Sequence, residues 1–225
     1  MGITVTVGTP HGRDIVPEYV TSLFASLGNG SGIGYKLCLL EGLYIHNTRN
    51  VMLRELDNDY LIFIDSDMSF KPGCIEKLIE LDKPVAGGVY LRRLPPYIPF
   101  AFNFDNQLIP QLVEPLPEEP FQCDAIATGF MLIKKEVAEF MVEKYNNPFD
   151  FISIMSGKKF LGEDMAFCKR LKDNNIELWA HPGLELGHVG YRVIQMNRSD
   201  NVRAKVVDII DNPMEEVELA AVASL

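Results

Sequence analysis

The stretch Leu61-Ile62-Phe63-Ile64-Asp65-Ser66-Asp67 is the most informative part of the sequence, because it joins a strand-sized apolar run to two acids. Tyr60 to Ile64 is continuously apolar, which is typical of a central parallel strand covered by helices on both faces. Alternation along an extended chain places Asp65 and Asp67 on one side. Ligands of open α/β sheets bind beyond the carboxyl ends of the strands. Two carboxylates there would need a cation, and Mg²⁺ or Mn²⁺ prefers oxygen ligands. The alternative is a turn and a helix cap before Pro72, since Asp favours both.

Strand and helix patterns alternate on both sides of this stretch. The strands predicted in the first half are Ile3–Val7, Lys36–Leu40, Tyr60–Ile64 and Val85–Tyr90. Helices are predicted from near Pro17 to Leu27, over about Ile45–Leu56, and from Pro72 onward. In the first helix, the predicted buried face has the spacing i, i+3, i+4, i+7 and consists of Val20, Leu23, Phe24 and Leu27. Strands separated by helices predict a mostly parallel sheet.

The second half has a different pattern. Leu91 to Pro120 is rich in proline and aromatic residues without a helical period, which predicts short antiparallel strands and loops. The further predicted strands are Phe121–Ala127, Phe130–Ile133 and Ile176–Ala180. One further helix would bury Val137, Phe140 and Met141, and another would cover Glu163 to Asp173. Residues 192–225 are expected to form a helical tail.

Composition narrows the class of protein. The chain has 225 residues, 47% apolar and 23% charged, which fits a globular protein of one or two domains. The net charge of −10 argues against binding to nucleic acid or to an anionic membrane surface. No apolar run approaches the ~20 residues of a membrane-spanning helix. The four cysteines are scattered without a C-x-x-C, which favours reduced thiols in a soluble cytoplasmic protein over two disulfides.

The segment Gly162-Glu163-Asp164 provides a second pair of acids. Asp164 shares a helical stripe with Phe167, Cys168 and Leu171, whereas Glu163 lies off that stripe. An inward carboxylate at the mouth of a core is a candidate general base. The alternative is an acid that favours a helix N-terminus, whose dipole would lower its pKa. A catalytic base at this position therefore needs a compensating environment.

Arginine and histidine candidates accompany the acids. Arg49 lies on the apolar face of its helix, where it would serve a phosphate or base edge, or pair with a carboxylate at the edge of the core. Arg92 and Arg93 follow a predicted strand. They would either bind a phosphate or lie in solvent at the end of that strand. His188 is flanked by Gly187 and Gly190, which allow a ligand to approach closely, although a hydrogen-bonded histidine is the commoner case. At the same sheet end as the aspartates, Thr9 and Pro10 would form a pocket floor beside His11.

In this order, the motifs resemble a small soluble glycosyltransferase of the GT-A fold, similar to glycosyltransferase family 2, from Ile3 to about Tyr191. The resemblance implies an α/β fold with a Rossmann-like, mostly parallel sheet and a smaller antiparallel acceptor-side region. It implies donor contacts from Thr9, Pro10, His11, Glu41, Arg49, Asn50, Asp65, Ser66 and Arg92. It further implies a metal site of Asp65, Asp67 and His188, and catalysis by Asp164 with Glu163. The implied acceptor-side residues are Thr128, Gly129 and Phe130.

The activity implied by the resemblance is transfer of a sugar from a nucleoside diphosphate sugar, UDP-sugar favoured, to a hydroxyl acceptor. Mn²⁺ or Mg²⁺ would assist, and one base with in-line attack would invert configuration, although a retaining outcome stays open. Residues 1–191 would form one catalytic domain, with a nucleotide-binding half (1–91) and an acceptor half (92–191). The Q-x-x-R-W motif of processive members is absent, which favours single transfer.

Two other classes of protein fit parts of the sequence. One is a phosphatase of the haloacid dehalogenase type, although its D-x-D usually lies on the first strand and precedes Thr or Val, whereas Met68 follows here. The other is a non-catalytic module that binds a nucleotide sugar. Release of phosphate from a generic phosphoester would favour the first, and tight binding without turnover would favour the second.

Overall fold

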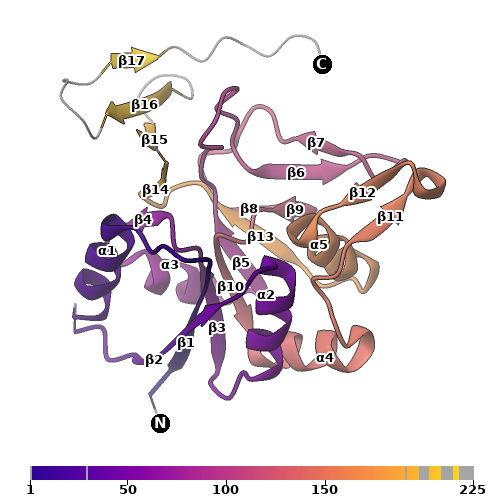
Figure 1. The fold of residues 1–225 in the computed structure, drawn as a ribbon, viewed down its shortest axis with the longest axis horizontal. Coiled ribbons are helices and arrows are strands. Elements are labelled where there is room, and N and C mark those ends of the chain that lie inside the picture. The colour runs from indigo at the N-terminus through magenta and orange to yellow at the C-terminus, as the bar shows by residue number, and fades with distance from the viewer. Residues whose placement is uncertain (1, 29, 191, 198–202, 209–214, 218–225) are drawn as a thin grey trace.

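The computed structural model describes residues 2–28, 30–190, 192–197, 203–208 and 215–217. Its centre is a seven-stranded sheet with the strand order β2-β1-β3-β10-β5-β13-β8 (Figure 1). These strands are β1 (Thr4–His11), β2 (Gly34–Glu41), β3 (Tyr60–Ile64), β5 (Val85–Gly88), β8 (Phe121–Gln122), β10 (Phe130–Lys134) and β13 (Leu178–His181). Strands β2, β1, β3, β5 and β13 run in one direction, and β10 and β8 run in the other. The predicted α/β class with a mostly parallel sheet is therefore confirmed.

Helices cover both faces of this sheet. On one face lie α1 (Pro17–Leu27) and α3 (Cys74–Glu80), and on the other lie α2 (Ile45–Arg54), α4 (Lys135–Tyr145) and α5 (Glu163–Asp173) (Figure 1). The side chains of β3 alternate between two buried clusters, with Leu61 and Phe63 in one and Ile62 and Ile64 in the other. Two covered faces explain why this strand is apolar at every position.

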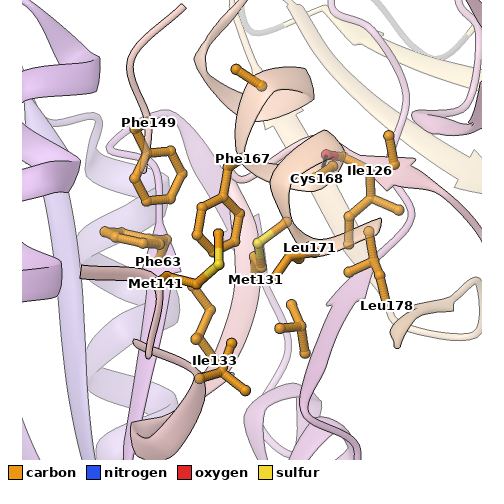
Figure 2. Close-up of a cluster of buried hydrophobic side chains, with 14 of the residues drawn as sticks. Phe63, Ile126, Met131, Ile133, Met141, Phe149, Phe167, Cys168, Leu171 and Leu178 are labelled. Atoms are coloured by element: carbon orange, nitrogen blue, oxygen red, sulfur yellow. Dashed lines mark hydrogen bonds between the residues drawn. The ribbon is translucent and has the colours of Figure 1, made fainter. Parts of the chain in front are cut away.

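Aromatic packing anchors α5 to the sheet. The Phe149 and Phe167 rings stack with centroids 4.3 Å apart, and Phe63 meets Phe149 edge-on at 5.5 Å (Figure 2). Phe63 precedes the end of β3 by one residue, and Phe167 lies one turn after the start of α5. The core therefore fixes the carboxyl end of β3 relative to the first turn of α5.

The remaining strands form smaller antiparallel units. One sheet contains β6 (Ala101–Phe104), β7 (Pro110–Leu112) and β9 (Ala125–Ile126), as predicted for the proline-rich region. A hairpin of β11 (Ile152–Ile154) and β12 (Lys159–Leu161) encloses the 3₁₀ turn Met155–Gly157 and leads directly into α5. A third sheet has the order β17-β16-β15-β14-β4 and contains β4 (Met68–Phe70), β14 (Leu186–Val189), β15 (Arg192–Asn197), β16 (Arg203–Asp208) and β17 (Glu215–Val217). Its β4–β14 pairing sets His188 opposite Met68.

Three expectations are corrected by the structure. The described parts of residues 192–225 are strands β15, β16 and β17 in place of the expected helix, because antiparallel pairing extends β14 outward. The α1 stripe is rotated: Val20 and Phe24 are exposed, whereas Tyr19, Leu23 and Ser26 are buried. In α4, Phe140 is exposed and Ala138 takes the inward position beside Val137.

Two further observations concern the class of protein. Within the described residues, every helix is too short or too polar to cross a membrane. Each of the four cysteines is a free thiol.

Candidate active site

A cleft of about 410 Å³ opens at the carboxyl ends of β1 and β3. The N–H of Gly42 donates to the carbonyl of His11 at 3.0 Å and ties the loop after β2 to the end of β1. The residues that line the cleft come from the end of β1, the loop after β2, the start of α2, the segments after β3 and β5, and β14. They are Pro10, His11, Gly12, Gly42, Leu43, Ile45, Thr48, Asp65, Ser66, Asp67, Arg93 and His188. The cleft thus lies where ligands bind in open α/β sheets.

Arg49 is a buried cation that joins two acidic segments behind this cleft. Its side chain is 2% exposed, and Nη2 donates to Asp65 Oδ1 at 2.6 Å while Nη1 donates to Glu163 Oε1 at 3.0 Å. Its guanidinium carbon lies 5.9 Å from the centroid of the Phe63 ring. Removing one partner from a buried ion pair leaves an uncompensated charge. Arg49 therefore fixes the end of β3 relative to the first turn of α5.

Asp67 lies in a different electrostatic setting at the mouth of the cleft. Arg93 Nη1 donates to Asp67 Oδ2 at 2.5 Å, and His188 Nε2 is 3.4 Å from the same oxygen. The other ring nitrogen, Nδ1, lies 3.2 Å from the carbonyl oxygen of Leu91. Burial acts to raise the pKa of Asp67, but His188 and Arg93 outweigh it and lower that pKa. Asp67 is therefore a stable anion at neutral pH.

A glycine allows Asp65 to approach the strand that lies next to β3. Asp65 N–H donates to the carbonyl of Gly129 at 3.0 Å, and Gly129 N–H donates to Tyr90 Oη at 3.0 Å. A Cβ at Gly129 would lie 2.3 Å from Tyr90 Oη and 3.1 Å from Asp65 Oδ2, which only a glycine avoids. Burial and the charges of Asp65 and Asp164 raise the pKa of Tyr90 well above its usual value, so this phenol stays neutral.

Asp164 occupies the first turn of α5, where it is partly buried. Burial and the charge of Glu163 raise the pKa of Asp164 to about 6, although Arg49 opposes the shift. This is the compensating environment that a base at a helix N-terminus requires. Glu163 is held by Arg49. The raised pKa of Asp164 suits proton transfer near neutral pH.

Two of the three predicted ligands of a divalent ion lie next to each other. Asp67 and His188 are adjacent, and their carboxylate and imidazole groups suit Mn²⁺. Asp65 lines the same cleft, but its Oδ1 is bonded to Arg49. Across the described residues, no three of the usual ligand side chains form a ready-made metal cluster. The donor chemistry fits a metal ion at Asp67 and His188, while Asp65 reaches such an ion only with its other oxygen or after release from Arg49.

The sequence-predicted donor residues fall into two groups. Pro10, His11, Asp65 and Ser66 line the cleft. The other five lie behind or beside it. The hydroxyl of Thr9 is hydrogen-bonded to that of Tyr19, Glu41 ends β2 opposite His11, and Arg49 joins Asp65 to Glu163. Asn50 is hydrogen-bonded to Asp150 and to the N–H of Phe149, and the backbone N–H of Arg92 donates to the carbonyl of Ile98. Asn50 thus fastens α2 to the segment before β11.

The acceptor-side segment is also divided. Gly129 contacts Asp65, and Thr128 is buried next to it. Phe130 is fully buried and packs on Phe70 with ring centroids 5.3 Å apart, so its side chain belongs to the core between the sheet and α1 and α3. Phe130 is the first residue of β10 and belongs to its buried face, whereas Thr128 and Gly129 precede the strand.

Sequence reasoning missed several cleft residues. Arg93, and not Arg92, turns toward Asp67. Gly42 and Leu43 in the loop after β2, and Ile45 and Thr48 on α2, also line the cleft, and Tyr90 supports Gly129 from behind. The position of this loop directly after the second parallel strand was a usable signal, because such loops gather at the ligand edge of the sheet.

Comparison with known proteins adds a family and a fold. The family description "Glycosyl transferase family 2" matches residues 14–151, more than half of the chain, and ends before Glu163, Asp164 and His188. No curated protein sequence matches the chain significantly. The structure is similar to that of A197 from STIV, with TM-score 0.57 and 15% identity over 96% of this chain and 98% of that one. It is also similar to GalNAc-T7 with UDP, GalNAc and Mn²⁺, with TM-score 0.58 and 11% identity over 84% of this chain and 43% of that one. The fold is accordingly GT-A, as the sequence resemblance implied.

Proposed function

The chain belongs to glycosyl transferase family 2, and from this premise we propose that it moves a sugar from a nucleoside diphosphate sugar to an acceptor hydroxyl. UDP-sugar is the favoured donor, and the reaction inverts the anomeric centre with the help of Mn²⁺ or Mg²⁺. The acceptor is a saccharide or another hydroxyl compound. The free thiols agree with a cytoplasmic location.

One observation carries this proposal: Arg49 is bonded at the same time to Asp65 and to Glu163. The contact unites the D-x-D segment at the end of β3 with the acid pair at the start of α5, which are about a hundred residues apart in sequence. A site for the donor diphosphate and a site for proton transfer are thereby adjacent. A family 2 enzyme needs both for a displacement at the anomeric carbon.

Asp164 is the proposed general base. It accepts the proton of the acceptor hydroxyl as that oxygen bonds to the anomeric carbon and the nucleoside diphosphate departs. With a pKa of about 6, its carboxylate is mostly ionised at neutral pH and still basic enough to hold the proton. Glu163 keeps Arg49 in place and raises the pKa of Asp164 by its charge.

Asp67, His188 and Asp65 are the proposed ligands of the divalent ion. When bound, such an ion neutralises the charge that develops on the departing diphosphate. Arg93 is bonded to Asp67 and half exposed, so it can transfer its hydrogen bonds to a diphosphate oxygen in the same cleft. Pro10, His11 and Ser66 line the part of the cleft assigned to the nucleoside.

The two alternative classes lose support. The D-x-D follows β3, the third strand along the chain, whereas haloacid dehalogenase phosphatases usually carry it on the first. A non-catalytic module would not need an acid with a raised pKa beside a donor cleft.

A panel of nucleotide sugars with Mn²⁺ tests the proposal. We expect one donor, a UDP-sugar, to raise the melting temperature and to release its nucleoside diphosphate slowly by hydrolysis. Asp67→Asn should abolish both effects, and Asp57→Asn, an exposed acid bonded to Lys36, should change neither. If no nucleotide sugar raises the melting temperature and the protein hydrolyses a generic phosphoester, the proposal is contradicted.

A further inference from the structure

Three ring side chains, two of them exposed and His46 partly buried, form a row next to the cleft. Tyr44 is 59% and Phe151 53% exposed, and His46 lies between them. The Tyr44 and His46 ring centroids are 5.9 Å apart, and those of His46 and Phe151 are 5.1 Å apart. Contiguous exposed apolar surface marks an interaction or ligand-binding site, whereas single exposed apolar residues are ordinary. We call these three residues the ring platform.

The ring platform is continuous with the donor cleft. Leu43 and Ile45, the neighbours of Tyr44 in the chain, both line the cleft, and Leu43 is 88% exposed. Nothing in the core requires an exposed leucine and tyrosine at the start of α2. The platform and the cleft therefore form one surface.

The platform also borders the proposed catalytic acids. His46 precedes Arg49 by three residues on α2, so the two share a helix face, and Arg49 reaches Glu163. Phe151 precedes Ile152, which pairs with Leu161, two residues before Glu163. The contact between the His46 and Phe151 rings and the hydrogen bond from Arg49 to Glu163 join α2 to these segments. Two independent elements thus carry rings to the approach to Glu163 and Asp164.

From this placement we infer that the ring platform is the acceptor subsite and that it binds a pyranose ring. This inference rests on the proposed function. A pyranose has a face lined by C–H groups and an edge of hydroxyls, so it combines an apolar surface with polar groups. Aromatic rings cover the apolar face, while a hydroxyl at the edge is directed toward Asp164. The platform contains no arginine or lysine, the side chains that would select an anionic acceptor.

Binding of neutral oligosaccharides provides the test. Chitotriose, cellotriose and maltotriose are titrated into the full-length protein with UDP and Mn²⁺ present, and the ring resonances of Tyr44, His46 and Phe151 are followed by NMR. We expect at least one trisaccharide to shift all three rings. Phe151→Ala and Tyr44→Ala should weaken that binding about two- to tenfold each. Phe24→Ala is the matched control, because Phe24 is 69% exposed on α1 at the opposite face of the sheet.

The outcomes separate this inference from the proposed function. Binding of UDP with Mn²⁺, measured by calorimetry on the same samples, tests the donor site and should be the same in Phe151→Ala as in wild type. If UDP binds but none of the three sugars shifts the platform rings, the acceptor subsite is wrong and the proposed donor function stands. If Tyr44→Ala instead dissociates a dimer in ultracentrifugation, the platform is a contact between copies and the inference is overturned.

Discussion

Asp67 and Asp164 are the same residue type on opposite sides of one site, yet their environments differ. Asp67, after β3, faces Arg93 and His188, which lower its pKa. Asp164, in the first turn of α5, faces apolar packing and the charge of Glu163, which raise its pKa to about 6. Arg49 lies between the two segments and contacts Asp65 and Glu163, the neighbours of these aspartates. Two carboxylates whose pKa values are pushed apart are suited to two different tasks.

We therefore assign binding of the cation and the diphosphate to the carboxyl end of β3, and proton transfer to the start of α5. A permanently ionised carboxylate suits a cation and a diphosphate, whereas a carboxylate with a pKa near neutrality suits a base. Substitutions at Asp164, Arg49 and Asp67 should therefore affect these two roles separately or together.

The largest effect is expected for Asp164→Asn. Removal of a positioned base should lower the single-turnover transfer rate by ~10²–10⁴-fold, because the acceptor hydroxyl keeps its proton. Donor affinity should stay within about twofold of wild type, since Asp164 lies outside the residues that line the cleft. Glu163→Gln is the matched variant and should lose less rate. If Glu163→Gln loses the rate and Asp164→Asn keeps it, the roles of the two acids are reversed.

Arg49→Met should come next and should affect both sides of the comparison. The methionine leaves Asp65 and Glu163 without their shared cation, which should lower the free energy of unfolding by about 3–5 kcal/mol. Chemical denaturation measures this change. Arg54→Met on the same helix removes an exposed arginine bonded to Asn146 and Asn147 and should cost less than about 1 kcal/mol. Equal losses in the two variants would contradict the structural role of Arg49.

Asp67→Asn should affect binding while the fold is kept. The neutral amide is a poorer ligand for a divalent ion, so we expect donor affinity in Mn²⁺ to fall at least ~10-fold by calorimetry. Affinity measured with EDTA present should change little, because the lost interaction depends on the metal. A fall of the same size with and without Mn²⁺ would show that Asp67 binds the donor without a metal.

The smallest effect concerns stability. Because burial raises the pKa of Asp164 from 3.8 to about 6, the unfolded chain loses this proton first, and stability falls as the pH rises from about 4 to about 6. At pH 7, Asp164→Asn should therefore increase stability by roughly 1 kcal/mol, or ~2–4 °C in melting temperature. At pH 4 the gain should vanish, since Asp164 is then protonated in the folded state. A lower melting temperature at pH 7 would mean that the carboxylate makes a stabilising contact.

Features of the fold and the site that depend on neighbouring residues could be predicted from the sequence, whereas contacts between distant segments could not. The continuous apolar run Tyr60–Ile64 and the helix Glu163–Asp173 have the bounds that the sequence predicts, because local pattern and burial agree. The sequence left open whether Arg49 meets a phosphate or a carboxylate. Its partner Glu163 lies 114 residues away, and no local pattern encodes that contact.

Position within the sheet was also outside the reach of local patterns. Phe130–Ile133 was predicted as a strand, but the insertion of β10 between β3 and β5, antiparallel to both, follows from the packing of the whole domain. The α1 face was misplaced for a similar reason. Its buried side includes Ser26 and Tyr19, and the Tyr19 hydroxyl bonds to Thr9 on β1, whereas a count of apolar residues selects Val20 and Phe24.

The most direct test of the division of roles is the pH dependence of kcat/KM for sugar transfer. The rate should fall about tenfold per pH unit below an apparent pKa of about 6, because protonated Asp164 cannot accept the acceptor proton. In Asp164→Asn the residual rate should be flat over this limb. A wild-type rate that stays constant down to about pH 4.5, or an Asp164→Asn profile that keeps the limb, would contradict the assignment of Asp164 as the base.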